Sequence, residues 1–118
     1  MLLMLDRIDE AESLIRKVYE TRVRVSGPDG DQTISALDEL AGAIYQRGDV
    51  AGAADLMKQV WDARRRTIGD DRPLTLLAGS NLATLYYRLG RAEEADKMLA
   101  DLIPTFDTIN MIGGEVEQ

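Results

Sequence analysis

Hydrophobic positions recur three or four residues apart along most of the chain. The pattern is clear in segment 37–44 and again in segment 82–89. This spacing places apolar side chains on one face of a helix, whereas a half-buried strand would alternate every two residues. The pattern therefore predicts an all-α fold. We expect helices near residues 7–25, 32–47, 50–68, 73–89 and 92–103.

Glycine and proline lie where these helices are expected to end or begin. The turns are predicted at Gly27–Gly30, Gly48–Asp49, Gly69–Pro73 and Gly90. Pro73 suits the first turn of a helix, because its missing N–H would be unpaired there in any case. Pro104 is expected to end or kink the last helix, so residues 105–118 are predicted to be a short helix or a flexible tail.

The chain also repeats itself with a period of about 42 residues, which is a sign of stacked helical repeats. Many residues recur identically one period later, on both helices of the repeating unit and in the turns. The identical pairs include Ala11 with Ala53, Leu14 with Leu56, Val18 with Val60, Arg22 with Arg64, Thr33 with Thr75, Leu40 with Leu82, and Gly48 with Gly90.

Within each period, one helix carries Leu40-Ala41 or Leu82-Ala83, and the next carries a small residue, Ala53 or Ala95. This arrangement resembles the tetratricopeptide repeat, in which small residues let two helices approach closely. The long period, segment 63–75 and segment 81–83 resemble the kinesin-light-chain-like subgroup.

The resemblance implies an α-α superhelix, a tetratricopeptide-like solenoid of about two and a half helical-hairpin repeats. We expect this domain over residues 1–104, with a partial repeat at 1–30 and repeats at 31–72 and 73–104. In the family, the first helix of each repeat lines a concave groove that binds peptides. The positions that match are Asp38, Glu39, Gly42 and Gln46 on one helix, and Leu77, Asn81, Thr84 and Arg88 on the next.

Asn81 is the most specific of these positions. The family often uses an Asn there to hydrogen-bond a peptide backbone, and an amide can donate and accept at once. The alternative is that Asn81 is simply a polar residue on a helix surface.

Three features depart from the family pattern. Met1–Leu5 is expected to supply only the last turn of a helix that precedes residues 7–25. Gly42 and Gly79 lie inside predicted helices at positions that tolerate larger residues, each at a cost of about 1 kcal/mol relative to Ala. Finally, no polar capping helix is evident at the C-terminal end.

Both ends are therefore expected to expose apolar side chains and to pair in a homodimer. A filament is less favoured, because a long acidic filament would accumulate like charge. The residues expected to be exposed are Leu3, Ile8 and Ile15 at one end, and Leu102, Ile103, Phe106 and Ile109 at the other.

Two further features have alternative interpretations. The run Arg64–Arg66 is expected to be a solvated face at a helix C-terminus, where the backbone dipole favours positive charge, although it could bind phosphate or an acidic peptide. Trp61 is expected to pack between neighbouring repeats, although it could instead be an exposed contact with another copy of the chain.

Composition excludes several kinds of chemistry. The chain contains no Cys and no His, which excludes thiolate nucleophiles, zinc sites of the Cys/His type and Ser-His-Asp triads. The neighbouring acids Asp38 and Glu39 point about 100° apart on a helix, so they form a poor catalytic pair. We expect no enzyme activity, no cofactor and no metal site.

Charge and hydropathy narrow the partners and the location. The net charge is −7, from 21 acidic and 14 basic residues, and it repels the phosphates of nucleic acid. The apolar stretch Met1–Leu5 falls far short of the roughly 20 residues that span a bilayer, and no secretory signal is evident. We therefore expect a cytoplasmic protein.

The sequence thus predicts a protein–protein interaction scaffold that binds a peptide or partner protein in its groove. One alternative is a self-associating structural module. Another is a regulatory or sensor repeat domain of a larger multidomain protein.

Overall fold

The computed structural model describes residues 2–102, with side-chain surroundings from residue 7 onward. Its helices are α1 (Leu2–Ser26), α2 (Asp31–Gln46), α3 (Val50–Ile68) and α4 (Pro73–Arg88). A further helix, here called the fifth helix, covers residues 92–102. The predicted all-α fold is confirmed, and no strand occurs within these residues.

The predicted helix boundaries agree with the structure to within about two residues, except at the N-terminus, and the predicted end of the last helix at residue 103 lies outside the described residues. At the N-terminus, α1 begins at Leu2, so residues 2–6 continue the same helix. The expectation that Met1–Leu5 ends a separate, preceding helix is therefore wrong. The reason is local, because no Gly or Pro interrupts the chain before Gly27.

Two equivalent glycines end α1 and α3. Gly27 and Gly69 have φ angles of 81° and 99°, in the left-handed region that favours residues without a Cβ. Their backbone N–H groups donate to Val23 O at 2.9 Å and to Arg64 O at 3.2 Å, which satisfies carbonyls at the helix ends. At the start of α3, the Asp49 side chain accepts a hydrogen bond from Gly52 N at 2.8 Å.

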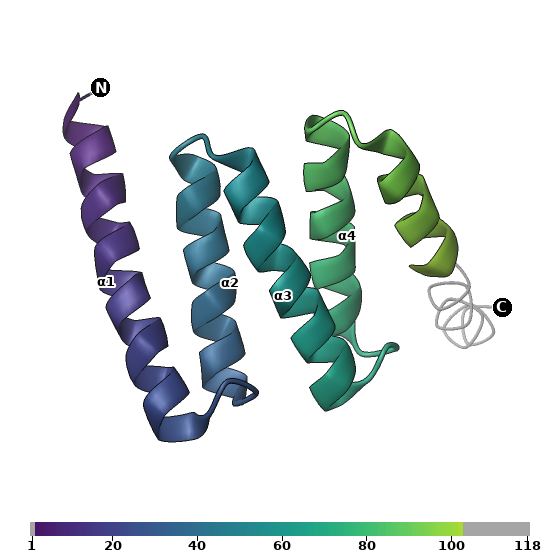
Figure 1. Cartoon of the computed structure of the whole chain (residues 1–118), viewed down its shortest axis with the longest axis horizontal. Coiled ribbons are helices and arrows are strands. Elements are labelled where there is room, and N and C mark those ends of the chain that lie inside the picture. The colour runs from purple at the N-terminus through teal and green to yellow at the C-terminus, as the bar shows by residue number, and fades with distance from the viewer. Residues whose placement is uncertain (1, 103–118) are drawn as a thin grey trace, which may run out of the picture.

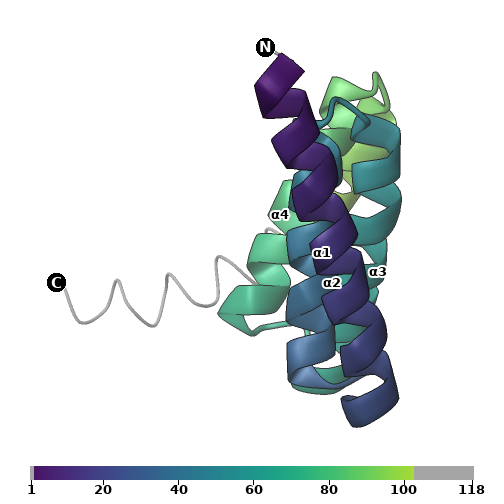
Figure 2. The same cartoon turned by 90° about the vertical axis from the view of Figure 1, so that its left-hand side faces the viewer.

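Successive helices stand side by side and run in opposite directions, in the order α1 to α4 and then the fifth helix (Figure 1). Among the four labelled helices of the described chain, contacts occur only between chain neighbours. The view turned by 90° places α3 and α4 on opposite sides of the stack (Figure 2). This two-layered row of helical hairpins is the architecture of a repeat solenoid.

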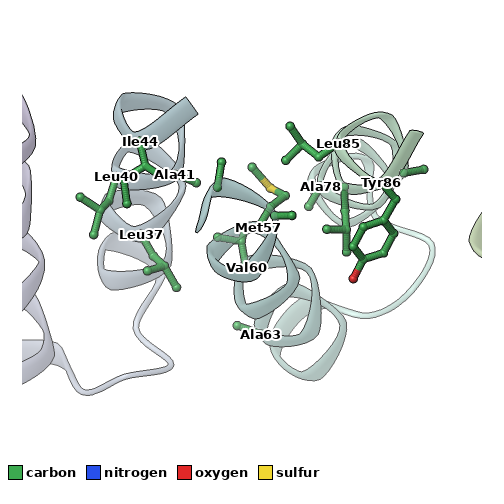
Figure 3. Close-up of a cluster of buried hydrophobic side chains, with 14 of the residues drawn as sticks. Leu37, Leu40, Ala41, Ile44, Met57, Val60, Ala63, Ala78, Leu85 and Tyr86 are labelled. Carbon is green, nitrogen blue, oxygen red and sulfur yellow. The ribbon is translucent and has the colours of Figure 1, made fainter. Parts of the chain in front are cut away.

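The core lies between the two layers. Leu40 and Leu82, which share one repeat position, are 1% and 0% exposed, and Val60 of α3 is 1% exposed. Figure 3 shows Val60 and Met57 on α3, between α2 and α4. The small repeat residues Ala41 and Ala53 are fully buried, which is consistent with their predicted role in close helix approach.

At the edge of the row, α1 contacts α2 alone among the labelled helices described here. Its outer face therefore carries exposed apolar side chains, Leu14 at 63% and Val18 at 43%. Ile8 and Ile15, which were expected to be exposed, are half-buried, and Ile15 packs against the core. Leu3 lies outside the residues whose side chains are described.

The expected exposure of Leu102 at the other end is wrong, because this residue is only 6% exposed. Its Cδ1 lies 3.0 Å from the point where a Cβ on Gly79 would stand, so it packs against α4. The expectations for Ile103, Phe106, Ile109 and segment 105–118 concern residues outside those that the structure describes.

Trp61 packs between neighbouring repeats, as predicted. Its ring lies against α4 at Gly79, where an added Cβ would meet Nε1 at 2.9 Å. The guanidinium of Arg65 covers the ring, 4.6 Å from its centroid. The expectation that Gly79 tolerates a larger residue is therefore wrong, since the absent side chain makes room for the indole.

Arg64 is also not the solvated residue that the sequence predicted. It is 4% exposed, and its Nη1 donates to Asp31 Oδ1 at 3.0 Å. Its Nη2 lies 3.4 Å from Ser35 Oγ. Arg65 and Arg66 are exposed as expected. The residues of one run thus differ because successive side chains point about 100° apart around the helix.

Candidate partner-binding groove

A cavity of about 320 Å³ opens between α2, α3 and α4, and we call it the central hollow. Three helices that are consecutive in the chain supply its walls. Its lining residues are Asp38, Ala41, Gly42 and Tyr45 of α2, Ala53 and Met57 of α3, and Asn81, Thr84, Leu85 and Arg88 of α4.

The floor of the central hollow is apolar. Ala41 and Ala53 are both 1% exposed, Met57 is 6% exposed and Leu85 is 8% exposed. In Figure 3, Met57 rises between α2 and α4, and Leu85 faces it from α4. The depression exists because two of the four floor residues are alanines, which leave space that larger side chains would fill.

The rim is polar. Asp38 lies on the α2 side, and Asn81, Thr84 and Arg88 follow one another at helical spacing on the α4 side. The Thr84 hydroxyl donates to the Ser80 carbonyl at 3.0 Å. At one end of the rim, the Arg88 guanidinium lies 5.6 Å from the centre of the Tyr45 ring, within cation–π range.

Gly42 leaves the α2 wall open. A Cβ built at this position would meet no heavy atom within 4 Å. The rim is therefore low at this point, and the hollow is accessible from the side of α2.

The surroundings of Asp38 affect the ionisation of its carboxyl. The pKa of its carboxyl is raised, chiefly by partial removal of the group from water. The positive charge of Arg64 lowers the pKa, and the neighbouring Glu39 carboxylate raises it again. Nearby positive charge therefore does not compensate the desolvation of Asp38.

Five of the eight residues predicted for the groove line this one hollow: Asp38, Gly42, Asn81, Thr84 and Arg88. Glu39, Gln46 and Leu77 are exposed but do not line it. Whether any of the eight binds a partner stays a prediction.

Sequence reasoning missed the floor of the hollow and one aromatic wall residue. The resemblance pointed only to the first helix of each repeat, whereas Ala53 and Met57 come from α3, a second helix. A signal was available in the repeated Ala41 and Ala53, whose small size predicts space beside them. The missed residues are Ala41, Tyr45, Ala53, Met57 and Leu85.

The described part of the chain offers neither a metal cluster nor a membrane span. Within residues 2–102, no group of three or more acidic, His or Cys side chains is placed to hold a metal ion. In the same range, no helix is long and apolar enough to cross a membrane.

Comparison with known families identifies the class of protein. The family described as Tetratricopeptide repeat matches residues 33–107, and a second family of the same description matches residues 1–30. The chain therefore belongs to the tetratricopeptide repeat family, whose repeats generally mediate protein–protein interactions.

Solved structures share the fold of this chain. The tetratricopeptide-like repeats of a kinesin-light-chain-type protein from Podosopora anserina superpose with a TM-score of 0.74 at 24% identity, over 85% of this chain and 47% of that chain. A variant of those repeats also has a TM-score of 0.74, at 22% identity, over 92% of this chain and 51% of that chain. The predicted resemblance to kinesin-light-chain-like repeats is thus confirmed at the level of the fold.

Curated relatives add only a short local match. A stretch of 21 residues, 18% of this chain, is 86% identical to one component of the NADH-quinone oxidoreductase of Anaeromyxobacter dehalogenans (strain 2CP-C). A match of the same length and identity occurs with the corresponding component from Anaeromyxobacter sp. (strain Fw109-5). Each match spans 5% of the relative's length, which is too little to carry a shared fold or activity.

Proposed function

We propose that this protein is a cytoplasmic, non-enzymatic scaffold that binds an extended segment of a partner protein in the central hollow. One observation carries the proposal: residues from two first helices, about one repeat apart, meet around a single hollow with an apolar floor and a polar rim. A rigid helical framework of this kind positions binding groups without moving parts.

Each part of the hollow has a role in this proposal. An apolar side chain of the partner fills the space above Met57 and Leu85, where its burial provides most of the binding free energy. The Asn81 amide holds the partner's backbone, because it can donate to a carbonyl and accept from an N–H. Arg88 offers N–H donors to a carbonyl or carboxylate at the other end of the rim.

The test is the substitution Asn81→Ala, measured by calorimetry or fluorescence polarisation with a partner or a selected peptide. Binding is expected to weaken by about 1 kcal/mol, or roughly fivefold, because a hydrogen bond at a buried contact is lost. Gln59→Ala is the matched control, since Gln59 is exposed on α3 and does not line the hollow. Arg64 is unsuitable as a control, because it is buried and ion-paired.

Circular dichroism separates binding from folding in this experiment. If Asn81→Ala lowers the melting temperature and leaves affinity unchanged, Asn81 is a helix-surface residue and the proposed role fails. Equal effects of Asn81→Ala and Gln59→Ala would lead to the same conclusion.

A second candidate function is self-association through the outer face of α1. The observation that favours it is the exposure of Leu14 and Val18. The residue of α3 equivalent to Val18 is Val60, which is buried against its neighbours. A two-fold axis would cover the face of each copy with that of the other and close the assembly as a homodimer. Light scattering at micromolar concentration tests this, because a stable monomeric mass rules the dimer out.

A further inference from the structure

The central hollow is charged unevenly, and this asymmetry narrows the class of partner. All the charged residues of α2 are acidic, namely Asp31, Asp38 and Glu39, and the helix contains no Lys or Arg. On the facing helix α4, Arg88 is the charged residue. Of these charged residues, Asp38 lines the hollow on its α2 side and Arg88 lines it at one end of its α4 side.

The acidic residues of α2 differ in whether a basic side chain of the same chain pairs with them. Asp31 is ion-paired with the buried Arg64, Nη1 to Oδ1 at 3.0 Å. Within the part of the chain that the structure describes, no Lys or Arg lies within ion-pair distance of Asp38 or Glu39, although both lie in the same helix. These two carboxylates are available to a cation from outside.

The position of Asp38 makes it the better placed of the two carboxylates for such a cation. The pKa of its carboxyl stays raised even though Arg64 lowers it, because the group is partly removed from water. The Asp38 side chain is nevertheless exposed, so a cation of a partner can reach its carboxylate. Asp38 also lines the hollow, so that cation would stand next to whatever fills the apolar floor.

Arg88 is less available to an acidic partner than Asp38 and Glu39 are to a basic one. Its guanidinium already lies over the Tyr45 ring, with 5.6 Å between the guanidinium carbon and the ring centre. The net charge of −7 adds a general repulsion against an acidic partner. Both effects favour a basic partner over an acidic one.

We infer that the central hollow selects an extended segment in which a Lys or Arg stands beside an apolar side chain, with the apolar group on Met57 and Leu85 and the cation at Asp38. Glu39, which lies outside the hollow, adds to the negative charge beside it. This inference rests on the proposed function and adds the chemistry of the partner. It predicts that binding weakens as salt rises, because part of the attraction comes from exposed charges.

The experiment uses three pools of fluorescein-labelled seven-residue peptides with a central Leu flanked on both sides by Lys, by Gln or by Glu. Fluorescence polarisation against the full chain is expected to rank Lys above Gln above Glu, with about a tenfold difference in Kd between the first and the last. Raising the salt concentration should reduce the affinity of the Lys pool most.

Charge reversal locates the selectivity. The double variant Asp38→Lys with Glu39→Lys should reverse the ranking of the pools. Its matched control is Asp9→Lys with Glu10→Lys, an adjacent acidic pair on α1 that makes the same change in net charge away from the hollow. The control should preserve the ranking.

Gly42→Leu tests the place of binding. A Cβ at this position meets no heavy atom within 4 Å, and Gly42 lines the hollow, so the Leu side chain should block all three pools without unfolding the chain.

The outcomes separate the inference from the proposed function. If the three pools bind equally and Gly42→Leu blocks them, the hollow binds peptides but does not select a cation, so only the inference fails. If both charge-reversed variants change the ranking alike, selectivity reflects net charge and the inference again fails alone. If no pool binds, or if Gly42→Leu leaves binding unchanged, the proposed function fails as well.

Discussion

Helices α1 and α3 occupy equivalent positions in successive repeats, and many of their residues are identical, but their environments differ. Val18 of α1 is 43% exposed and Val60 of α3 is 1% exposed. The cause is position in the row, since α3 lies between α2 and α4 whereas α1, among these helices, touches α2 alone. A repeated residue thus has no fixed burial, because burial depends on how many neighbours its helix has.

The two junctions between successive repeats also differ in the residues that fill them. At the junction of α3 and α4, Trp61 is large and Gly79 is small, and the indole occupies the space of the missing side chain. One period earlier, the corresponding residues are Tyr19, which packs against the core, and Leu37, which is 6% exposed. A larger residue on one helix is matched by a smaller one on the other, which keeps both junctions filled.

The largest expected difference between the repeats is at the valine pair. Val60→Ala should lower the free energy of unfolding by about 2–3 kcal/mol, because it removes buried methyl groups and leaves a cavity. Val18→Ala should cost less than about 1 kcal/mol, since its side chain already meets water. Urea denaturation of both variants measures the two values. Equal costs would show that the α1 face is covered in solution, as the homodimer requires.

Replacing the helix-interior glycines Gly79 and Gly42 by Ala should change the stability of the fold in opposite directions. Gly79→Ala should destabilise the fold by about 1–3 kcal/mol, since its Cβ would stand 2.9 Å from Trp61 Nε1 and 3.0 Å from Leu102 Cδ1. Gly42→Ala should stabilise the fold by about 0.5–1 kcal/mol, because Ala favours the helix and meets no neighbour. Thermal denaturation reports both signs, and a stabilising Gly79→Ala would contradict the packing of Trp61.

The equivalent threonines should also differ, by a smaller amount. Thr33 Oγ1 donates to the Gly27 carbonyl at 2.8 Å, whereas Thr75 Oγ1 is buried with no hydrogen-bond partner among the described residues. Thr33→Val should therefore cost about 1 kcal/mol, and Thr75→Val should be close to neutral or slightly stabilising. Chemical denaturation of the two variants decides between this outcome and equal losses, which would indicate a bound water at Thr75.

The smallest expected effect concerns an exposed ion pair between the repeats. The pKa of Asp29 is lowered, first by the hydrogen bond from Arg66, 2.6 Å from Nη2 to Oδ1. Desolvation opposes this shift, and the positive charge of Arg66 makes a smaller contribution that lowers the pKa further. Because the folded pKa is the lower one, the pair contributes above the unfolded pKa of Asp29, and its contribution disappears as the pH falls through the folded pKa. Arg66→Gln should return the pKa toward 3.8, as measured by NMR titration of the Asp29 carboxyl. An unchanged pKa would show that the pair does not persist in solution.

Much of the candidate site followed from the sequence, because the resemblance assigned groove positions residue by residue. Asp38, Gly42, Asn81, Thr84 and Arg88 do line one hollow. The floor did not follow, because the resemblance assigned to the groove neither the buried residues of the first helices, Ala41 and Leu85, nor any residue of the second helix. Its depth depends on the distance between α2 and α4, which no local pattern specifies.

The sequence by itself determined the helices, their turns and the repeat architecture. These features arise from local properties: a 3.6-residue hydrophobic period, glycines that adopt positive φ, and identical residues one repeat apart. The tertiary structure decided which of those residues are buried. Arg64 is buried and paired with Asp31, whereas Val18 is exposed. The reason is that burial depends on neighbouring helices. Two residues of one type have different surroundings when one lies on a helix inside the row and the other on the helix at its edge.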